Sequence, residues 1–163
     1  METITPVLLL VLVETARLRW FVAAVGLDGQ ATPLLRSDVG DLEKYRTLDF
    51  DEQVAFLRHR FCGVLQRGCD RLWARSWKAC HFVFVFDELL PDATGQLTQE
   101  VANHFTQWML NPPVVVFNRA RSGLVKLAGE LDPTREGLVH AHLDTLRATR
   151  EDANGWELVP KKV

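Results

Sequence analysis

Three short apolar runs, none of them broken by a polar side chain, constrain the fold of this chain more than any other feature of its sequence. They cover residues 7–13 (VLLLVLV), 82–86 (FVFVF) and 114–117 (VVVF). A strand that is apolar on both faces is typical of a parallel sheet covered on both sides. Because parallel neighbours need long crossovers, we expect these three strands to lie side by side at the centre of an α/β sheet, joined by helices.

Two further strands form an arm beside the first central strand. Residues 18–26 and 32–36 are the expected strands, and Asp28-Gly29 between them is a hairpin signal, because glycine tolerates positive φ. Pro33 has no N–H to donate, which favours the edge of a sheet. We therefore expect both strands to be antiparallel at one side of the central three.

Helices are predicted from apolar residues that recur with a period near 3.6. The longest covers residues 50–77, with acidic residues at its start and basic residues toward its end, as the helix dipole favours. Another covers residues 96–110 and stops before two prolines, which cannot continue a helix. Residues 124–131 and 133–150 are expected to form the last two helices, and the polar residues 37–49 an irregular connection.

The length and composition fit a single domain. The chain has 163 residues, 47% of them hydrophobic, enough for one core over residues 7–150 with a short tail, 151–163. The longest apolar stretch, residues 6–13, is too short to cross a membrane and has no preceding basic residue of a signal peptide. Three cysteines, an odd number, suggest reduced thiols. We expect a cytoplasmic protein without a membrane partner.

The order of elements, three strands followed by alternating helices and strands, resembles the ribonuclease H-like fold. The resemblance covers about residues 7–150. It implies three layers, with a mixed five-stranded sheet between helices on both faces. The superfamily includes ribonucleases H, Holliday-junction resolvases, transposases and, in duplicated form, actin-like ATPase domains. The stretch Glu14-Thr15-Ala16-Arg17 lacks the glycine through which the actin-like branch admits a phosphate to the backbone.

Acidic residues at the carboxyl ends of the predicted strands suggest one candidate site. Ligands of open α/β sheets bind outside these ends, where Glu14 and Asp87 would lie about 5 Å apart, one strand spacing. Carboxylates this close can share a divalent cation. The resemblance adds Glu52 and Glu136, with Asp144 as the alternative to Glu136, as ligands for Mg²⁺ or Mn²⁺. Each acid also has a structural interpretation: the strand-end acids can cap turns, and Glu52 complements a helix dipole.

Basic residues recur at helical spacing along the first long helix and its end: Arg60, Arg67, Arg71, Arg75 and Lys78. Such a stripe could follow a phosphate backbone, with Trp73 or Trp77 stacking on bases. It could equally bind an acidic protein, or be a solvated helix face. Beyond the last helix, Trp156 belongs to an apolar tail that either packs on its own domain or pairs with the sheet edge of a partner.

No complete catalytic signature accompanies these features. The chain has no Gly-rich phosphate loop and no GxSxG nucleophile elbow. His59 and Cys62 have a helical spacing that suits a metal, but nothing in the sequence completes the ligand set. Our leading hypothesis is therefore a non-catalytic protein-binding or assembly module that needs no cofactor. The alternative is a Mg²⁺- or Mn²⁺-dependent nuclease that uses the four acids and holds nucleic acid with the basic stripe.

Overall fold

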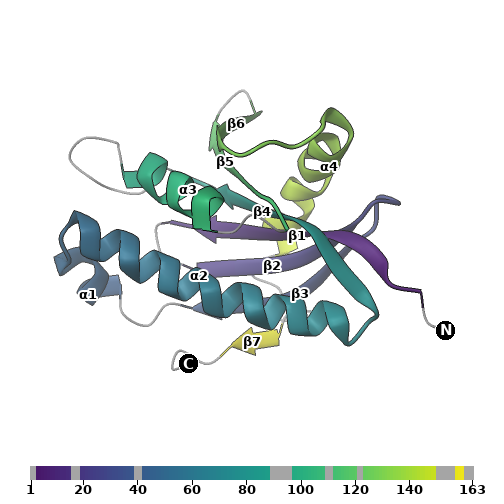
Figure 1. Ribbon diagram of the computed structural model, residues 1–163, viewed down its shortest axis with the longest axis horizontal. Helices are drawn as coiled ribbons and strands as arrows, with labels where there is room; N and C mark the ends of the chain where they lie inside the picture. The colour runs from purple at the N-terminus through teal and green to yellow at the C-terminus, as the bar shows by residue number, and fades with distance from the viewer. Residues whose placement is uncertain are drawn as a thin grey trace.

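The computed structural model describes residues 3–15, 19–38, 42–88, 97–108, 112–120, 123–149 and 157–159. One mixed sheet with the strand order β6-β5-β4-β1-β2-β3-β7 organises them. The strands are β1 (Thr5–Glu14), β2 (Arg19–Gly26), β3 (Ala31–Asp38), β4 (Trp77–Phe86), β5 (Val114–Ala120), β6 (Gly123–Ala128) and β7 (Glu157–Val159). The helices are α1 (Leu42–Thr47), α2 (Phe50–Trp73), α3 (Leu97–Trp108) and α4 (Pro133–Thr149). Helices lie on both faces of the sheet (Figure 1), so the predicted α/β class is confirmed.

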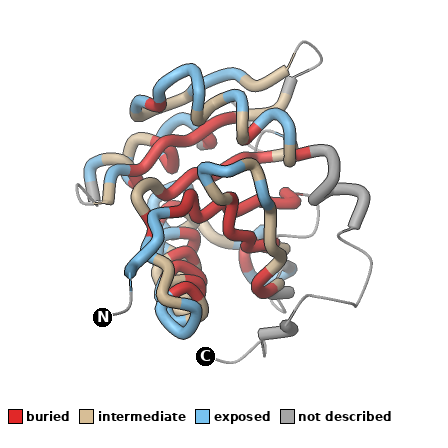
Figure 2. The backbone as a smooth tube through the Cα atoms, turned by 90° about the vertical axis from the view of Figure 1, so that its right-hand side faces the viewer, coloured by how far each residue is buried: buried red, intermediate tan, exposed pale blue. Residues whose placement is uncertain are grey.

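The three apolar runs lie where their composition requires. β1 pairs in parallel with β4, and β4 with β5, while β2 and β3 continue the sheet in antiparallel pairs on the other side of β1. Figure 2 shows these central strands almost entirely buried. We refer below to the carboxyl end of the sheet, where β1, β4 and β5 finish, and to the opposite amino end, where they begin.

Alternate residues of β1 supply two separate apolar layers. Val7, Leu9, Val11 and Val13 belong to the layer beneath α2 and α3, whereas Leu8, Leu10 and Leu12 belong to the layer beneath α4. Phe61 of α2 is the centre of the first layer: its ring lies 4.4 Å from that of Trp20 and 4.3 Å from that of Phe105. Both layers are needed because the sheet is apolar on both faces.

Close contact between α2 and the sheet depends on a glycine. A Cβ built on Gly68 would lie 3.1 Å from a methyl carbon of Leu9 and 3.2 Å from one of Val22. A larger side chain at Gly68 would therefore push α2 away from the sheet. Gly63 has no such role, because nothing lies within 4 Å of a Cβ at that position.

Two strands extend the sheet beyond the predicted five. Residues 124–131, predicted as a helix, instead contribute β6, which pairs antiparallel with β5. β6 ends at Ala128, and the next residue, Gly129, has a φ of +82° and a position where a Cβ would overlap the Val114 carbonyl oxygen. At the other side, β7 pairs in parallel with β3 through residues 35–37. Residues 157–159 of the tail therefore pair with the sheet of their own domain, one of the two outcomes left open by the sequence.

Smaller differences affect the connections. α2 ends at Trp73 rather than Trp77, and β4 begins at Trp77, five residues before the predicted strand. Ser76, with φ +58°, turns the chain between them, and its carbonyl accepts a hydrogen bond from the Thr5 N–H. The connection expected to be irregular contains α1. Within the described residues, no helix combines the length and apolarity that a membrane span requires.

Candidate functional site

The two strand-end acids lie at the carboxyl end of the sheet, as predicted. Val13 and Phe86 are partners in the parallel ladder of β1 and β4, so Glu14 and Asp87 follow on adjacent strands. The Asp87 N–H donates a hydrogen bond to the Val13 carbonyl over 3.0 Å. The register therefore places Glu14 and Asp87 next to each other on neighbouring strands, but their side chains have different partners.

Glu14 forms an ion pair across the β1–β2 hairpin. Arg19 donates to both of its carboxylate oxygens, from Nε over 2.9 Å and from Nη2 over 3.0 Å. Both side chains are largely buried, with 7% of Glu14 and 12% of Arg19 exposed. A two-point guanidinium–carboxylate contact of this kind is strong and directional. The positive charge of Arg19 thereby compensates the negative charge of the Glu14 carboxylate inside the fold.

Asp87 stabilises the turn that follows β1. Its Oδ1 accepts hydrogen bonds from the backbone N–H and from the hydroxyl of Thr15, each over 2.9 Å. Thr15 is only 4% exposed, so its N–H has little access to water and needs a protein partner. The capping role, which the sequence left open for Asp87, is thus observed directly.

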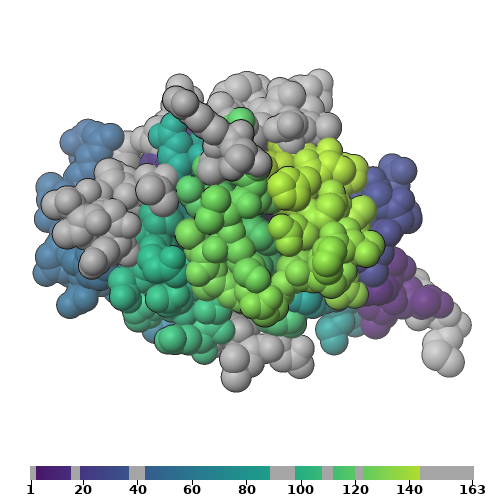
Figure 3. Space-filling model, turned by 90° about the horizontal axis from the view of Figure 1, so that it is seen from above, coloured from purple at the N-terminus to yellow at the C-terminus, as the bar shows by residue number. Residues whose placement is uncertain are grey.

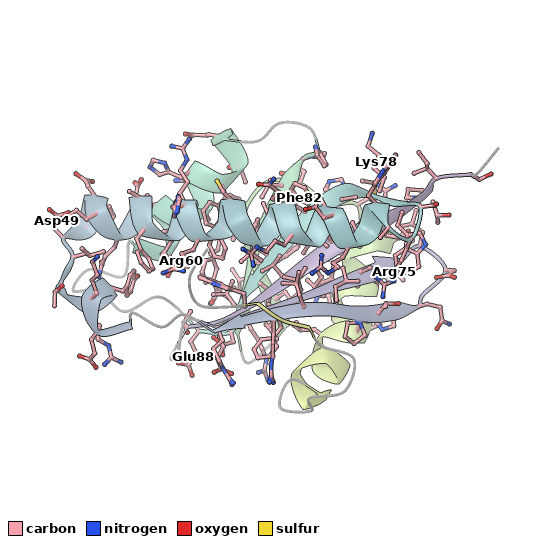
Figure 4. The ribbon with its side chains drawn as sticks, turned by 90° about the horizontal axis from the view of Figure 1, so that it is seen from below. Asp49, Arg60, Arg75, Lys78, Phe82 and Glu88 are labelled. Atoms are coloured by element: carbon pink, nitrogen blue, oxygen red, sulfur yellow. The ribbon has the colours of Figure 1, made fainter. Side chains whose placement is uncertain are left out.

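Glu52 and Glu136, the two predicted ligands on helices, do not form a common site with Glu14 and Asp87. Glu52 is exposed and belongs to a capping box with Asp49, in which each side chain accepts a hydrogen bond from the backbone of the other. Figure 4 shows Asp49 and Glu88 in one half of the molecule, whereas Arg75 and Lys78 lie toward the opposite end. The N-terminus of α2 is therefore near the carboxyl end of the sheet, but the Glu52 carboxylate is committed to the helix.

Glu136 lies elsewhere because β6 returns the chain to the amino end of the sheet before α4 begins. His81, near the start of β4, accordingly feels the charges of Arg135 and Asp132. In Figure 3, α4 lies between the β5–β6 region and the β2–β3 hairpin. The prediction that Glu136 converges with the other acids is wrong. The side chain of Asp144, the alternative ligand, falls outside the described residues.

The described parts of the chain contain no group of three or more His, Cys, Asp or Glu side chains arranged to hold a metal ion. His59 and Cys62 do face a groove of about 510 Å³ between α2 and α3, together with His104. Burial raises the pKa of the Cys62 thiol, more than nearby Arg58 lowers it, which disfavours the reactive thiolate. All three cysteines are free, as expected.

The predicted basic stripe is only partly helical. Arg60, Arg67 and Arg71 lie on α2, but Arg75 follows its end and Lys78 belongs to β4. The prediction of one stripe of five residues on a helix is therefore wrong for the last two. Arg75 instead lies over the ring of Trp77, 5.7 Å from its centroid, in a cation–π contact. The last predicted binding residue, Trp156, is outside the described residues.

Sequence reasoning missed an apolar groove at the amino end of the sheet. Its volume is about 400 Å³, and the start of β1, the β2–β3 hairpin and the start of β4 line it. The apolar residues of its wall are Pro6, Val7, Ala24, Leu27 and Trp77. Leu27, an apolar residue directly before the Asp28-Gly29 turn, is 42% exposed. That exposed leucine was the available signal, but the sequence could not show that β4 begins at Trp77.

Two more apolar side chains are exposed in the segments that lead into this groove. Ile4, 45% exposed, directly precedes the groove residue Thr5. Trp73, 64% exposed, is the last residue of α2, four residues before Trp77.

Comparison of the chain with protein-family models, with curated proteins and with solved structures finds no match. The assignment of a function therefore depends on the residues and their geometry.

Proposed function

We propose that this protein is a non-catalytic protein-binding or assembly module on a ribonuclease H-like scaffold, and that it binds its partner through the groove at the amino end of the sheet. The strand order β5-β4-β1-β2-β3, with only β2 antiparallel to its neighbours, supports the resemblance in scaffold. β6 and β7 are additions to that arrangement. Because a fold does not determine a function, the proposal depends on the groove.

The observation that carries the proposal is the exposure of large apolar side chains around this groove. Leu27 forms part of its wall, Ile4 directly precedes the wall residue Thr5, and Trp73 lies four residues before the wall residue Trp77. Exposed apolar patches on soluble domains mark sites of interaction. A groove of about 400 Å³ is large enough to take one or two side chains of a partner. Aromatic residues such as Trp77 are enriched where binding energy concentrates.

The engaged carboxylates weigh against the alternative, a Mg²⁺- or Mn²⁺-dependent nuclease. To bind a metal, Glu14 would have to leave Arg19, and Asp87 could offer only Oδ2 while its Oδ1 accepts from Thr15. Breaking the largely buried contact between Glu14 and Arg19 would cost free energy. Binding of nucleic acid without a metal would depend on Arg60, Arg67 and Arg71 of α2.

The test is site-specific crosslinking from the groove, followed by measured affinities. A photo-reactive amino acid replaces Leu27 in one protein and Val125 in another; Val125 is similarly exposed, at 47%, but lies on β6. We expect a protein that is crosslinked from position 27 and not from position 125. The purified partner should then bind the Leu27→Asp variant at least tenfold more weakly than wild type. It should bind the Val125→Asp and Asp87→Asn variants normally.

Two results would overturn the proposal. Equal crosslinking from positions 27 and 125 would mean that the groove is not selective. Metal-dependent cleavage of nucleic acid that Asp87→Asn abolishes would establish the nuclease, because Asp87 would then act on a metal rather than on Thr15.

A further inference from the structure

The outer edge of β3 takes a strand in parallel, and in this chain that strand is its own C-terminal segment. Glu157, Leu158 and Val159 of β7 are opposite Leu35, Arg36 and Ser37. The remaining part of β3, residues 31–34, pairs only with β2 within the described residues. A pairing of three residues is short compared with a typical strand of five or six, so it contributes few hydrogen bonds.

The arginines of α2 border this edge. At about 100° per residue, Arg60, Arg67 and Arg71 fall within about 40° of one another around the helix. The groove with His59, Cys62 and His104 occupies the flank that faces α3, so the arginine flank faces the other way. Figure 1 shows β7 beside α2 on the side away from α3, and Figure 4 shows Arg60 and Arg75 on the side of α2 toward β3.

The charge of the tail complements this flank. Residues 151–159 (EDANGWELV) contain three acidic residues and no basic one. Sheet edges bind extended peptides through main-chain hydrogen bonds, while side-chain contacts select the sequence. Acidic residues in the added strand would lie near guanidinium groups, which favours association and orientation.

We propose that the β3 edge, bordered by Arg60, Arg67 and Arg71, is a docking site for an acidic, extended segment of a partner protein. Residues 157–159 of this chain occupy the site until such a segment displaces them. The strand pairing uses residues 35–37 of β3, whereas the groove includes β3 only at Thr32, so the proposal is tested independently of the function proposed above. Residues 157–159 act as an intramolecular competitor, which a partner segment has to displace.

The experiment uses the full chain and a labelled peptide with the sequence of residues 150–160. Leu158→Pro removes a backbone N–H and should release β7, whereas Val163→Pro changes a tail residue outside β7 and is the matched control. Fluorescence anisotropy then measures peptide affinity. We expect Leu158→Pro to bind the peptide at least tenfold more tightly than wild type or Val163→Pro. Val159→Pro provides a second release variant, and circular dichroism verifies that each variant is folded.

Charge reversals on α2 test the chemistry of the site. In the Leu158→Pro background, Arg67→Glu should weaken binding about fivefold. Arg58→Glu, on the flank that faces α3, should leave it unchanged. A peptide with its acids replaced by Gln and Asn should bind about tenfold more weakly than the acidic one.

Three results would overturn the proposal. Equal affinities of the wild-type and release variants would show that the tail does not compete for the edge. No binding by any folded variant would show that the edge accepts no strand in trans. A dimer that forms when β7 is intact and disappears in Leu158→Pro would assign the edge to a second copy of this chain instead of a partner.

Discussion

The two ends of the sheet differ in whether their side chains have partners within the fold. At the carboxyl end, where ligands of α/β proteins usually bind, Glu14 and Asp87 are held by Arg19 and Thr15 and serve the turn between β1 and β2. At the amino end, apolar side chains such as Leu27 are exposed around a groove. The comparison shows that the position of an acid in the fold does not by itself reveal its role, which depends on the partners of its side chain.

The largest expected effect is at the carboxyl end. Arg19→Ala should lower the free energy of unfolding by about 3 kcal/mol, because it leaves the Glu14 carboxylate buried without this partner. Chemical denaturation measures the change. The double variant Glu14→Gln with Arg19→Met should lose clearly less, since no charge is then left behind. If the losses of the single variants Glu14→Gln and Arg19→Met add up to the loss of the double variant, the two residues are not coupled, which would contradict the account.

A smaller effect is expected next to it. Thr15→Val keeps the backbone N–H that binds Asp87 but removes the hydroxyl that donates to the same oxygen. The free energy of unfolding should fall by about 1 kcal/mol, the net value of one hydrogen bond. Thr15→Ser, which keeps the hydroxyl, should retain most of this free energy of unfolding in the same denaturation experiment. A loss as large as that of Arg19→Ala would mean that the turn depends on more than this contact.

Toward the amino end, a histidine should make stability depend on pH. Burial lowers the pKa of His81 below its ordinary value of 6.5, so the unfolded chain takes up its proton at a higher pH than the folded one. The His81 contribution to stability is therefore complete above about pH 6.5 and decreases as the pH falls toward the lower, folded pKa. Thermal melts of wild type and His81→Gln between pH 7.5 and 5.5 measure the difference. Parallel curves would contradict the assignment.

The smallest effect on stability is expected in the groove itself. Leu27→Asp should change the free energy of unfolding by no more than about 0.5 kcal/mol, because the side chain is 42% exposed. The same substitution should impair partner binding, which separates recognition from folding. Denaturation beside Val125→Asp makes the comparison at matched exposure. A loss of several kcal/mol would show that Leu27 belongs to the core.

The buried part of the fold could be predicted from the sequence because its signals are local and strong. The runs at residues 7–13, 82–86 and 114–117 are apolar on both faces, and no position other than the centre of a covered sheet suits them. The apolar stripe of α2 is long enough to identify a helix. Pairing and order follow from the rule that parallel strands need crossovers.

The parts that were missed depend on contacts distant in sequence. Residues 124–131 carry apolar residues at a spacing that also fits a helix, and pairing with β5 decides in favour of a strand. Whether Glu14 meets Asp87 or Arg19 depends on side-chain partners that no spacing rule reveals. The groove combines three segments, from β1, the hairpin and β4. Trp77 lines it because the chain turns at Ser76 and β4 begins at Trp77, within the range that was predicted as helix.

The central claim is that Glu14 and Asp87 serve the fold rather than a metal, and thermal melting with and without millimolar Mn²⁺ at constant ionic strength tests it most directly. A site with a dissociation constant 100-fold below the metal concentration would stabilise the protein by about 2.7 kcal/mol, a rise of roughly 5–10 °C for a chain of this length. Our account predicts that wild type and Asp87→Asn each shift by less than about 1 °C. A rise of several degrees in wild type that is absent in Asp87→Asn would contradict it and establish a metal site at the carboxyl end of the sheet.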